Sequence, residues 1–323
     1  MPLQVVPATG PVLEQILDDT FSIWHDGLSR ENYGKSWAAQ IRTSWGLSHL
    51  DRVALVDGPH VLSSAKRYDL SLRLDGRIRR VLGIGAVFTA PAHRGRGHAR
   101  ELVARMLDTA VTEGQEFAML FSEIEPAFYE RLDFVPVPLL ESTLEVDQKR
   151  GGAPAMLVRS GDDRDLPSIV EMSAARSATA RLALDRSEDF IRFNITRKRL
   201  ASGLAPSGHR NTEFLVVEEG SQAVAYLVST EENGRWMIEE AGDRDPAGAR
   251  LGAMLQVMLA RHPSERLPEI KCWWPRALVP PQLKVAASTP TQEVLMLRPL
   301  RDRILPLPPL ASGQVVYWHS DYF

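Results

Sequence analysis

The stretch covering residues 81–111 constrains the fold more than any other part of this chain. Residues 81–88 form an apolar run of β-branched and small side chains, which is typical of a buried strand. A basic, glycine-rich turn interrupts this run. Apolar residues then recur at helical spacing, at Leu102, Met106, Ala110 and Val111. The turn is therefore predicted to join the end of a strand to the N-terminus of a helix.

The chemistry of this turn suits an anion. Free backbone N–H groups and the positive end of the helix dipole favour negative charge at a helix N-terminus, and glycines let phosphate oxygens approach the main chain closely. Arg94 and Arg96 add positive charge. A P-loop would need a Gly-Lys-Ser/Thr sequence and a dinucleotide fold would need G-x-G-x-x-G, and the turn has neither. It predicts a phosphate-binding loop of another kind.

The turn resembles motif A of the GNAT superfamily of N-acetyltransferases, R/Q-x-x-G-x-G/A, preceded by a strand that ends in Val-x-x-x-Pro. In that family the loop binds the pyrophosphate of acetyl-coenzyme A, and main-chain N–H groups of the strand serve the reacting carbonyl. The resemblance implies two groups of cofactor-binding residues. They are Val87, Phe88 and Thr89 on the strand, and Arg94, Gly95, Arg96, Gly97, His98 and Ala99 in the turn. An exposed basic turn before an ordinary helix is the alternative.

A second segment resembles motif B of the same family. Residues 117–121 read as another buried strand, and Phe128-Tyr129 and Leu132-Asp133-Phe134 follow. The resemblance places the Tyr129 hydroxyl near the coenzyme sulfur, as the general acid. Asp133 stands where glycine is usual, and aspartate tolerates a left-handed helix ending better than most residues. Packing of Tyr129 between Phe128 and Phe134 is the alternative. The resemblance covers roughly residues 1–140.

Three groups are candidates for the catalytic base. Glu123 and Glu125 follow the strand that splays from the cofactor strand in this fold, and either could take a proton directly or through water, or be a solvated charge. The third is the α-carboxyl group of Phe323. The aromatic residues 317–323 are unlike a polar, frayed end and are predicted to be docked. The Gly83-Ile84-Gly85-Ala86-Val87 strand and the C-terminal extension resemble the enhanced-intracellular-survival acetyltransferases, in which the carboxylate of the final phenylalanine is the base; plain packing of the tail is the alternative.

The acceptor site is expected near the early helices. A strand is predicted over residues 3–6 and helices over 12–24 and 33–45, and the family places the amine between such helices and the splayed strands. Trp24, Asp26 and Trp37 are the predicted substrate-binding residues, because indole rings and a carboxylate suit a cationic amine. Core packing of the tryptophans is the alternative.

The second half of the chain restarts the same order of elements. Charged, glycine- and proline-containing residues 149–154 signal a boundary, so we expect a catalytic domain over 1–150 and a second domain over 151–323 whose C-terminal tail docks toward the active site. The predicted fold class is α/β (α+β): two GNAT-like domains, each a mixed, mostly antiparallel sheet flanked by helices. Where the second domain would hold pyrophosphate it has Asp243 and Asp245, with Asp245 expected to cap a helix and Pro246 to lie in its first turn. This copy is predicted to be catalytically silent and to form a pocket wall or an oligomer face.

Composition excludes several classes of protein. A net charge of −3 lacks the basic excess of a general nucleic-acid binder. No apolar run approaches the ~18 residues of a membrane span, and the start of the chain lacks a secretory pattern. The single cysteine fits a reducing cytoplasm, and the histidines lack metal-ligand spacing, so no metal is expected.

Together these features predict an acetyl-coenzyme A dependent N-acetyltransferase. The expected acceptor is the primary amine of a small molecule, such as an amino acid, a polyamine or an aminoglycoside-like compound, attacking directly in a ternary complex. Residues 86–99 also resemble fungal lysine acetyltransferases, which adds free lysine or a related diamine. A homo-oligomer is possible. A protein N-acetyltransferase and a non-catalytic acyl-coenzyme A sensor are the alternatives; Tyr129 favours catalysis over sensing.

Overall fold

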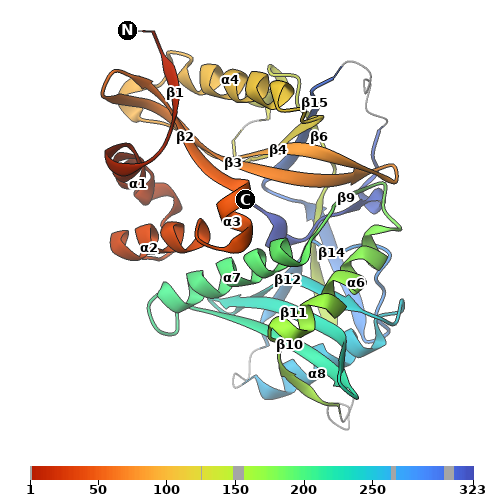
Figure 1. Cartoon of the computed structure of the whole chain (residues 1–323). Coiled ribbons are helices and arrows are strands. Elements are labelled where there is room, and N and C mark those ends of the chain that lie inside the picture. Colours follow the sequence, from red (N-terminus) through yellow and green to blue (C-terminus); the bar gives the residue numbers. More distant parts are fainter. Residues whose placement is uncertain (1, 125, 148–155, 263–266, 302–308) are drawn as a thin grey trace. The chain divides into compact units, whose positions relative to one another are not determined.

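The computed structural model describes residues 2–124, 126–147, 156–262, 267–301 and 309–323. Within these ranges the protein forms two compact units, and both are discontinuous along the sequence. Unit 1 comprises Met1–Val137, Gln292–Leu310 and Phe323, and unit 2 comprises Pro138–Thr291 and Ala311–Tyr322. The fold class predicted from the sequence is confirmed, because each unit is a mixed sheet flanked by helices (Figure 1).

Unit 1 is built on a sheet with the strand order β1-β2-β3-β4-β5-β15-β6. β4 and β5 are parallel, and the other neighbours are antiparallel. The strands are β1 (Gln4–Pro7), β2 (Leu50–Asp57), β3 (His60–Leu74), β4 (Arg77–Thr89), β5 (Phe117–Ser122), β6 (Val135–Pro136) and β15 (Val294–Pro299). The helices are α1 (Gly10–Trp24), α2 (Arg30–Gln40), α3 (Ser44–His49), α4 (His98–Thr112) and α5 (Ala127–Glu130), with the short 3-10 turn η1 (Pro91–His93).

Alternation along the strands distributes the side chains of unit 1 to two faces. On β2, Leu55 packs with the α4 residues Leu102 and Met106, whereas Ala54 and Val56 pack with Ile16 of α1. The predicted helix over residues 33–45 is divided into α2 and α3, because the Thr43 side chain accepts the Gly46 N–H and starts a new helix there. The β3–β4 hairpin turn at Asp75-Gly76 has positive φ at both residues, as its tight turn requires.

Unit 2 repeats this plan with the strand order β14-β7-β13-β12-β11-β10-β8. β12 and β13 are its parallel pair. The strands are β7 (Leu140–Val146), β8 (Val158–Ser160), β10 (Arg210–Glu219), β11 (Gln222–Glu232), β12 (Arg235–Asp243), β13 (Glu269–Cys272) and β14 (Leu283–Pro290); β9 (Leu182–Leu184) pairs in parallel with β16 (Val315–Val316). The helices are α6 (Leu166–Ser177), α7 (Glu188–Leu204) and α8 (Ala249–Arg261), with the 3-10 turns η2 (Asp163–Asp165), η4 (Ser312–Gln314) and η5 (His319–Asp321).

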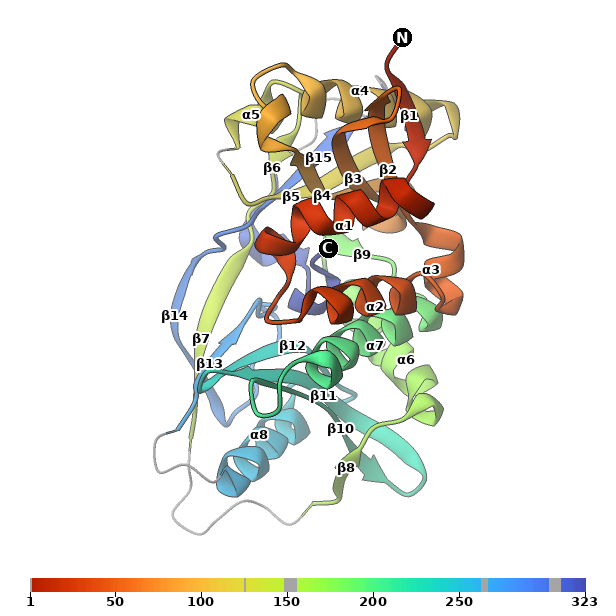
Figure 2. The same ribbon diagram turned by 90° about the vertical axis from the view of Figure 1, so that its left-hand side faces the viewer.

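The sheet of unit 2 is covered on both faces (Figure 2). Phe214 and Val216 of β10 pack with residues of α6 and α7, and the intervening Leu215 and Val217 pack with residues of α8. Ser187 caps α7, because its hydroxyl accepts the Phe190 N–H.

Each sheet contains one strand that comes from the other half of the sequence. β15, from late in the sequence, lies between β5 and β6 in unit 1. β7, which follows β6 in the sequence, lies between β13 and β14 in unit 2. The boundary expected at residue 150 therefore differs from the observed break after Val137, because a contiguous division would give β7 to the first domain and β15 to the second. The predicted linker residues 149–154 lie outside the described residues.

The C-terminal segment up to Tyr322 is anchored in the core of unit 2. Tyr317 and Trp318 are fully buried, and Asp321 forms an ion pair with Arg186 at 3.1 Å and accepts a hydrogen bond from Asn194. The neighbouring Ser320 hydroxyl donates to Glu240 at 2.6 Å. Burial raises the pKa of Asp321 to about 6, although the Arg186 charge opposes this shift. Residues 317–322 therefore pack into unit 2, and docking of the tail toward the active site stays a prediction.

Candidate active site

A bulge in β4 shapes the first part of the site. Lys66 of β3 pairs with Gly85 and Ser64 pairs with Phe88, so that two β4 residues, Ala86 and Val87, lie opposite one β3 residue. Ala86 adopts a left-handed conformation with φ 46°, which is uncommon for a residue with a side chain. A bulge leaves one residue unpaired in the ladder, so this part of β4 can offer main-chain groups to a ligand.

A buried serine fixes the strand after this bulge. The Ser63 hydroxyl donates to the Phe88 carbonyl at 2.6 Å and accepts from the Thr89 hydroxyl at 3.1 Å. Sequence reasoning missed Ser63 and the bulge at Ala86. The Ser63-Ser64 pair inside an otherwise apolar strand was the available signal for the first, and nothing in the sequence marked the second.

The parallel ladder between β4 and β5 ends beside the bulge. Its last pair is Ile84 with Leu120, although β4 continues to Thr89 and β5 to Ser122. The two strands therefore separate toward their carboxyl ends, as the family resemblance implied. Crevices at the carboxyl ends of parallel strands are where open α/β sheets bind ligands.

The predicted phosphate-binding loop, residues 94–99 and called the cradle below, forms the turn between β4 and α4. Gly95 and Gly97 have φ values of 75° and 83°, and no atom lies within 4 Å of where a Cβ would stand on either residue. Gly97 is the N-cap of α4 and supplies no side-chain acceptor, which leaves the first N–H groups of this helix available to an anion. The Arg94 guanidinium donates to the Thr89 carbonyl at 3.1 Å and so ties the exposed turn to the strand. These residues fit the diphosphate of a coenzyme A molecule.

Tyr129 lies on the short helix α5. Its ring packs against Phe128 and Phe134 at centroid distances of 4.9 and 6.0 Å. Burial raises the pKa of Tyr129 to about 12, and the negative charge of Glu123 acts in the same direction. Asp133 ends this turn in the left-handed conformation, with φ 59°, so the expectation for this unusual residue is confirmed.

Glu123 joins Tyr129 to the first predicted substrate residue. The Trp24 indole N–H donates to the Glu123 carboxylate at 3.4 Å, and the Trp24 ring meets Phe88 edge-on at 6.2 Å. The structure thus brings Trp24, Phe88, Glu123 and Tyr129 into one group. Glu125, the other acid considered from the sequence, lies outside the described residues.

The two remaining predicted substrate residues occupy different surroundings. Trp37 is buried, and its ring is covered by the protein's own cations, with the Arg52 guanidinium at 4.8 Å and the Lys66 amine at 5.7 Å from the ring centroid. Asp26 lies in the turn after α1, with φ 53°. Among the three predicted substrate residues, Trp24 is the one that the described contacts join to Glu123.

Phe323 lies against β4 just before the bulge. Its ring packs on Tyr68 at 4.7 Å and meets Phe121 edge-on at 5.8 Å. A Cβ atom on Gly85 would stand 3.2 Å from the α-carboxyl carbon of Phe323 and from one of its oxygens, and a Cβ on Gly83 would stand 3.1 Å from the Phe323 ring. The two glycines of β4 therefore make room for this residue, which lies where β4 and β5 separate.

The corresponding turn of unit 2 holds a carboxylate of the protein itself. The Asp243 side chain accepts the N–H groups of Arg250 at 2.9 Å, Leu251 at 3.0 Å and Asp245 at 2.8 Å. Burial raises the pKa of Asp243, and these three donors oppose the rise. The expectation that Asp245 and Pro246 begin the helix was wrong: α8 starts at Ala249, after a Gly248 N-cap, and the acid that caps it is Asp243.

The comparison with known families decides the nature of unit 1. A family model described as an acetyltransferase (GNAT) domain matches residues 12–137. Residues 12–137 are a GNAT domain. The bulged β4, the glycine turn and Tyr129 all lie inside this GNAT domain.

Related proteins extend the likeness. An uncharacterised N-acetyltransferase of Streptomyces avermitilis is 29% identical over 135 residues, which are 41% of this chain and 32% of that relative, so the match spans about a third of the relative's length. The structure of a GCN5-related N-acetyltransferase from Kribbella flavida is similar with a TM-score of 0.66 and 17% identity, over 92% of this chain and 70% of that one. Eis1 from Mycobacterium abscessus is similar with a TM-score of 0.53 and 14% identity, over 93% of this chain and 74% of Eis1. Beyond the GNAT domain, these structures show a shared fold.

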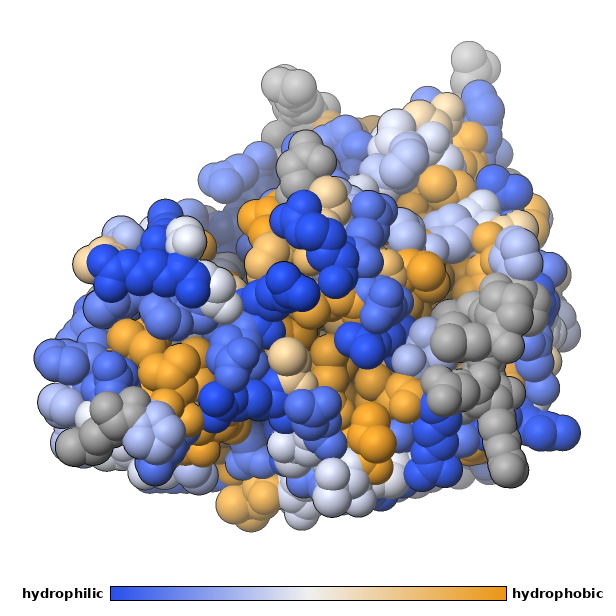
Figure 3. Space-filling view, turned by 90° about the horizontal axis from the view of Figure 1, so that it is seen from above, coloured by the Kyte–Doolittle hydropathy of each residue, from blue (hydrophilic) through white to orange (hydrophobic). Residues whose placement is uncertain are grey.

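None of the helices that the structure describes combines the length and apolar character needed to cross a membrane. The face seen from above carries apolar patches among hydrophilic residues (Figure 3).

Proposed function

We propose that this protein transfers the acetyl group of acetyl-coenzyme A to a primary amine of a small molecule. The observation that carries the proposal is the open glycine turn at the N-terminus of α4, next to a bulged β4 that has separated from β5. When bound, acetyl-coenzyme A supplies the acetyl group as an activated thioester. The remaining chemistry falls to residues of the protein.

Residues of the turn and of β4 would hold and orient the coenzyme. Main-chain N–H groups of Gly95, Arg96, Gly97, His98 and Ala99, with the side chains of Arg94 and Arg96, would bind its diphosphate. The Arg94 main-chain N–H already donates to the Pro91 carbonyl. Main-chain groups of Val87, Phe88 and Thr89 would align the acyl carbonyl and donate to its oxygen as negative charge develops. The hydrogen bonds of Ser63 hold this part of β4 in place.

Tyr129 would provide the proton that the departing thiolate takes up. A general acid must keep its proton at the working pH, and the pKa of about 12 ensures this for Tyr129. The base that receives the proton of the amine would be Glu123 or the α-carboxylate of Phe323. The charge of Glu123 acts on the Tyr129 hydroxyl, and the α-carboxyl carbon of Phe323 lies against Gly85.

The acceptor amine would enter on the side of Trp24 and Glu123. A carboxylate next to an indole ring suits an ammonium group before it loses its proton. Amino acids, polyamines and aminoglycoside-like amines all present such a group. Asp26 and Trp37 stay predicted binding residues for the acceptor amine. Trp37 is the weaker candidate of the two, because Arg52 and Lys66 already cover its ring.

Unit 2 would not bind a second coenzyme. The Asp243 carboxylate already takes the N–H groups that a diphosphate would need at the start of α8. A single acetyl-coenzyme A per protein molecule is therefore expected from calorimetric titration.

Coenzyme binding and turnover test this proposal separately. Gly95→Ala and Arg94→Glu should each weaken acetyl-coenzyme A binding by about tenfold or more, because one strains a positive-φ residue and the other reverses a charge at the diphosphate. Gly58→Ala is the matched control, since Gly58 also has positive φ and open space around it but lies in the β2–β3 turn. Equal binding by Gly95→Ala, Arg94→Glu and the control would refute the cradle.

Thiol release with a panel of amines then tests catalysis. Lysine, a polyamine and an aminoglycoside represent the proposed acceptors, and an N-terminal peptide represents a protein acetyltransferase. Glu123→Gln and a variant with residues appended after Phe323 separate the two candidate bases, because the base is the group whose change abolishes turnover without loss of coenzyme binding. Tight coenzyme binding without release of thiol on any amine would instead indicate a sensor.

A further inference from the structure

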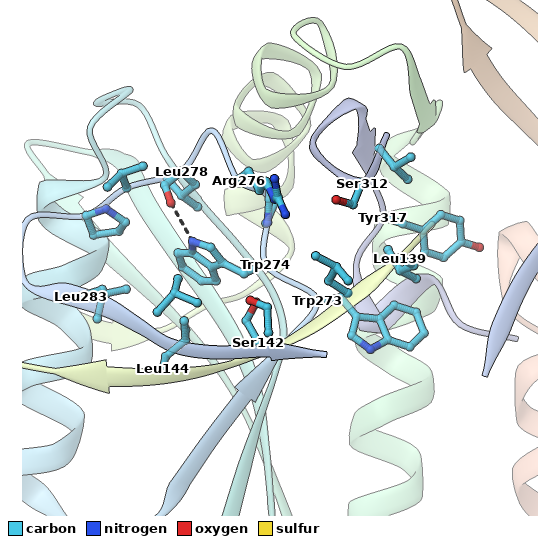
Figure 4. A pocket seen from close by; sticks show the side chains of 17 residues that line it. Leu139, Ser142, Leu144, Trp273, Trp274, Arg276, Leu278, Leu283, Ser312 and Tyr317 are labelled. Carbon is cyan, nitrogen blue, oxygen red and sulfur yellow. Dashed lines mark hydrogen bonds between the residues drawn. The ribbon is translucent and has the colours of Figure 1, made fainter. Parts of the chain in front are cut away.

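Unit 2 contains a cavity of about 240 Å³ that lies outside the GNAT domain (Figure 4). Its floor is one face of the β7–β14 pair, formed by Leu144, Leu283 and Val285 among others. Trp273 and Trp274, from the segment after β13, lie over this floor, and Tyr317 lies toward one end. All of its lining residues belong to unit 2.

The polar atoms in this wall are largely satisfied by one another. The hydroxyls of Ser142 and Ser288 form a hydrogen bond of 2.9 Å across the two strands. The Trp274 indole N–H donates to the Leu278 carbonyl at 2.7 Å, drawn as a dashed line in Figure 4. The cavity therefore offers a ligand an apolar body of indole, leucine, valine and proline side chains.

Arg276 supplies the charge among the residues that line this cavity. Its exposed side chain lies between Trp274 and Ser312 in Figure 4. Among the residues that the structure describes, no carboxylate lies within ion-pair distance of its guanidinium. Most other arginines that the structure describes in unit 2 have an acid partner, as Arg159 does in its pair with Asp165 at 2.7 Å. A planar guanidinium without an acid partner is suited to bind a carboxylate through two parallel hydrogen bonds.

We propose that this cavity binds a small apolar monocarboxylate, an aromatic or medium-chain aliphatic acid. Its carboxylate would lie on Arg276, and its body would lie between the two indoles and the β7–β14 floor. A volume of about 240 Å³ lies below the roughly 300–1,000 Å³ of drug-sized ligand pockets, so the cavity accepts one ring with a short side chain rather than a drug-sized molecule. The site is independent of the proposed acetyl transfer, because none of its residues lies in unit 1.

Isothermal titration of the full-length protein with 3-phenylpropanoate and with 3-phenylpropan-1-ol tests this site. The two probes share a body of matching size and differ in charge. The acid should bind saturably and about five- to tenfold more tightly than the alcohol, as a charged hydrogen-bonded pair at a partly exposed site allows. Arg276→Ala should remove this preference and leave alcohol binding unchanged. Arg261→Ala, which removes an exposed arginine at the end of α8, is the control and should change neither affinity.

A second variant tests the cavity itself. Val285 lies in its wall and is 47% exposed, so Val285→Trp should fill the space without disturbing the core and should weaken both probes. Circular dichroism checks that each variant keeps the wild-type melting temperature. The proposal is overturned if neither probe saturates at about 10 mM, if acid and alcohol bind equally, or if Arg276→Ala retains the preference for the acid.

Discussion

Tyr129 shows how the environment of one side chain sets its chemistry. The same ring contacts that suggested simple core packing from the sequence also remove the hydroxyl from water, and this desolvation raises its pKa to about 12. Packing and catalysis are therefore compatible roles for this residue. The raised pKa keeps the phenol protonated until the thiolate departs, but it also makes the proton transfer to a thiolate of lower pKa uphill.

Tyr129→Phe should lower kcat by about 10²-fold and leave acetyl-coenzyme A affinity within about twofold, because the acid acts in the reaction and its ring remains packed. Since the pKa lies above that of a free tyrosine, the protonated form persists to higher pH, and ionisation of Tyr129 should not reduce the rate below about pH 11. Tyr33→Phe, which removes a hydroxyl bonded to Thr20, is the control. A Tyr129→Phe enzyme with wild-type kcat would eliminate this residue as the acid.

Single residues differ in how far the sequence predicts them. The cradle glycines could be recognised because positive φ at a helix start selects glycine, and Asp133 because its neighbours define the end of a turn. Ala86 could not, because alanine has no preference for the bulge that imposes φ 46° on it. Asp243 was identified as an acid in the wrong place for a phosphate, but its role as the cap depends on a fold-back that sequence spacing does not specify.

At the scale of elements, α4 and α8 start in the same way, but their N-termini have different roles. Each follows a strand, and each has a glycine N-cap in the left-handed conformation. In α4 no side chain accepts from the cap position, whereas in α8 the buried Asp243 accepts two of the first N–H groups. The N-terminus of α4 can therefore bind an anion from outside the protein. The N-terminus of α8 is already occupied by Asp243 and has a structural role.

Asp243→Ala should destabilise unit 2 by about 1–3 kcal/mol, because three N–H donors lose their acceptor. Urea unfolding followed by circular dichroism measures this loss. Asp245→Ala provides the comparison, since Asp245 accepts only the exposed Ala247 N–H among its described bonds and should cost at most about 1 kcal/mol. If the two variants unfold alike, the carboxylate of Asp243 does not hold the helix start.

Many helices and strands followed from periodicity and capping residues, but no strand was predicted at β7, β14 or β15, and some predicted elements have other ends. The helix predicted over 33–45 was divided at Thr43, and α8 began later than Pro246. These ends depend on hydrogen bonds to residues that propensity does not include. Strand pairing was beyond sequence reasoning in a stronger sense, because β7 and β15 have the apolar patterns of ordinary strands and nothing in them states which sheet they join.

At the scale of the whole molecule, the exchanged strands make the contiguous halves poor folding units. A fragment of residues 1–150 should fail to give a cooperative thermal transition, because it lacks β15 and so exposes the edge of β5. Residues 1–137 joined by a flexible linker to residues 292–300 should fold better, since this fusion restores that strand. Solubility and circular dichroism melting compare the two. A well-folded fragment 1–150 that binds acetyl-coenzyme A would show that β15 is dispensable.

The late position of β15 in the sequence also determines the order in which the two units can be completed during synthesis. The ribosome releases almost all of unit 2 before it releases β15, so the nascent GNAT domain must wait with one strand position unfilled while its neighbour is made. Until then the edge of β5 is open to pairing with other polypeptides, a hazard that chaperone binding would relieve. A protein cut to the recognisable residues 12–137 would keep that gap in its sheet permanently.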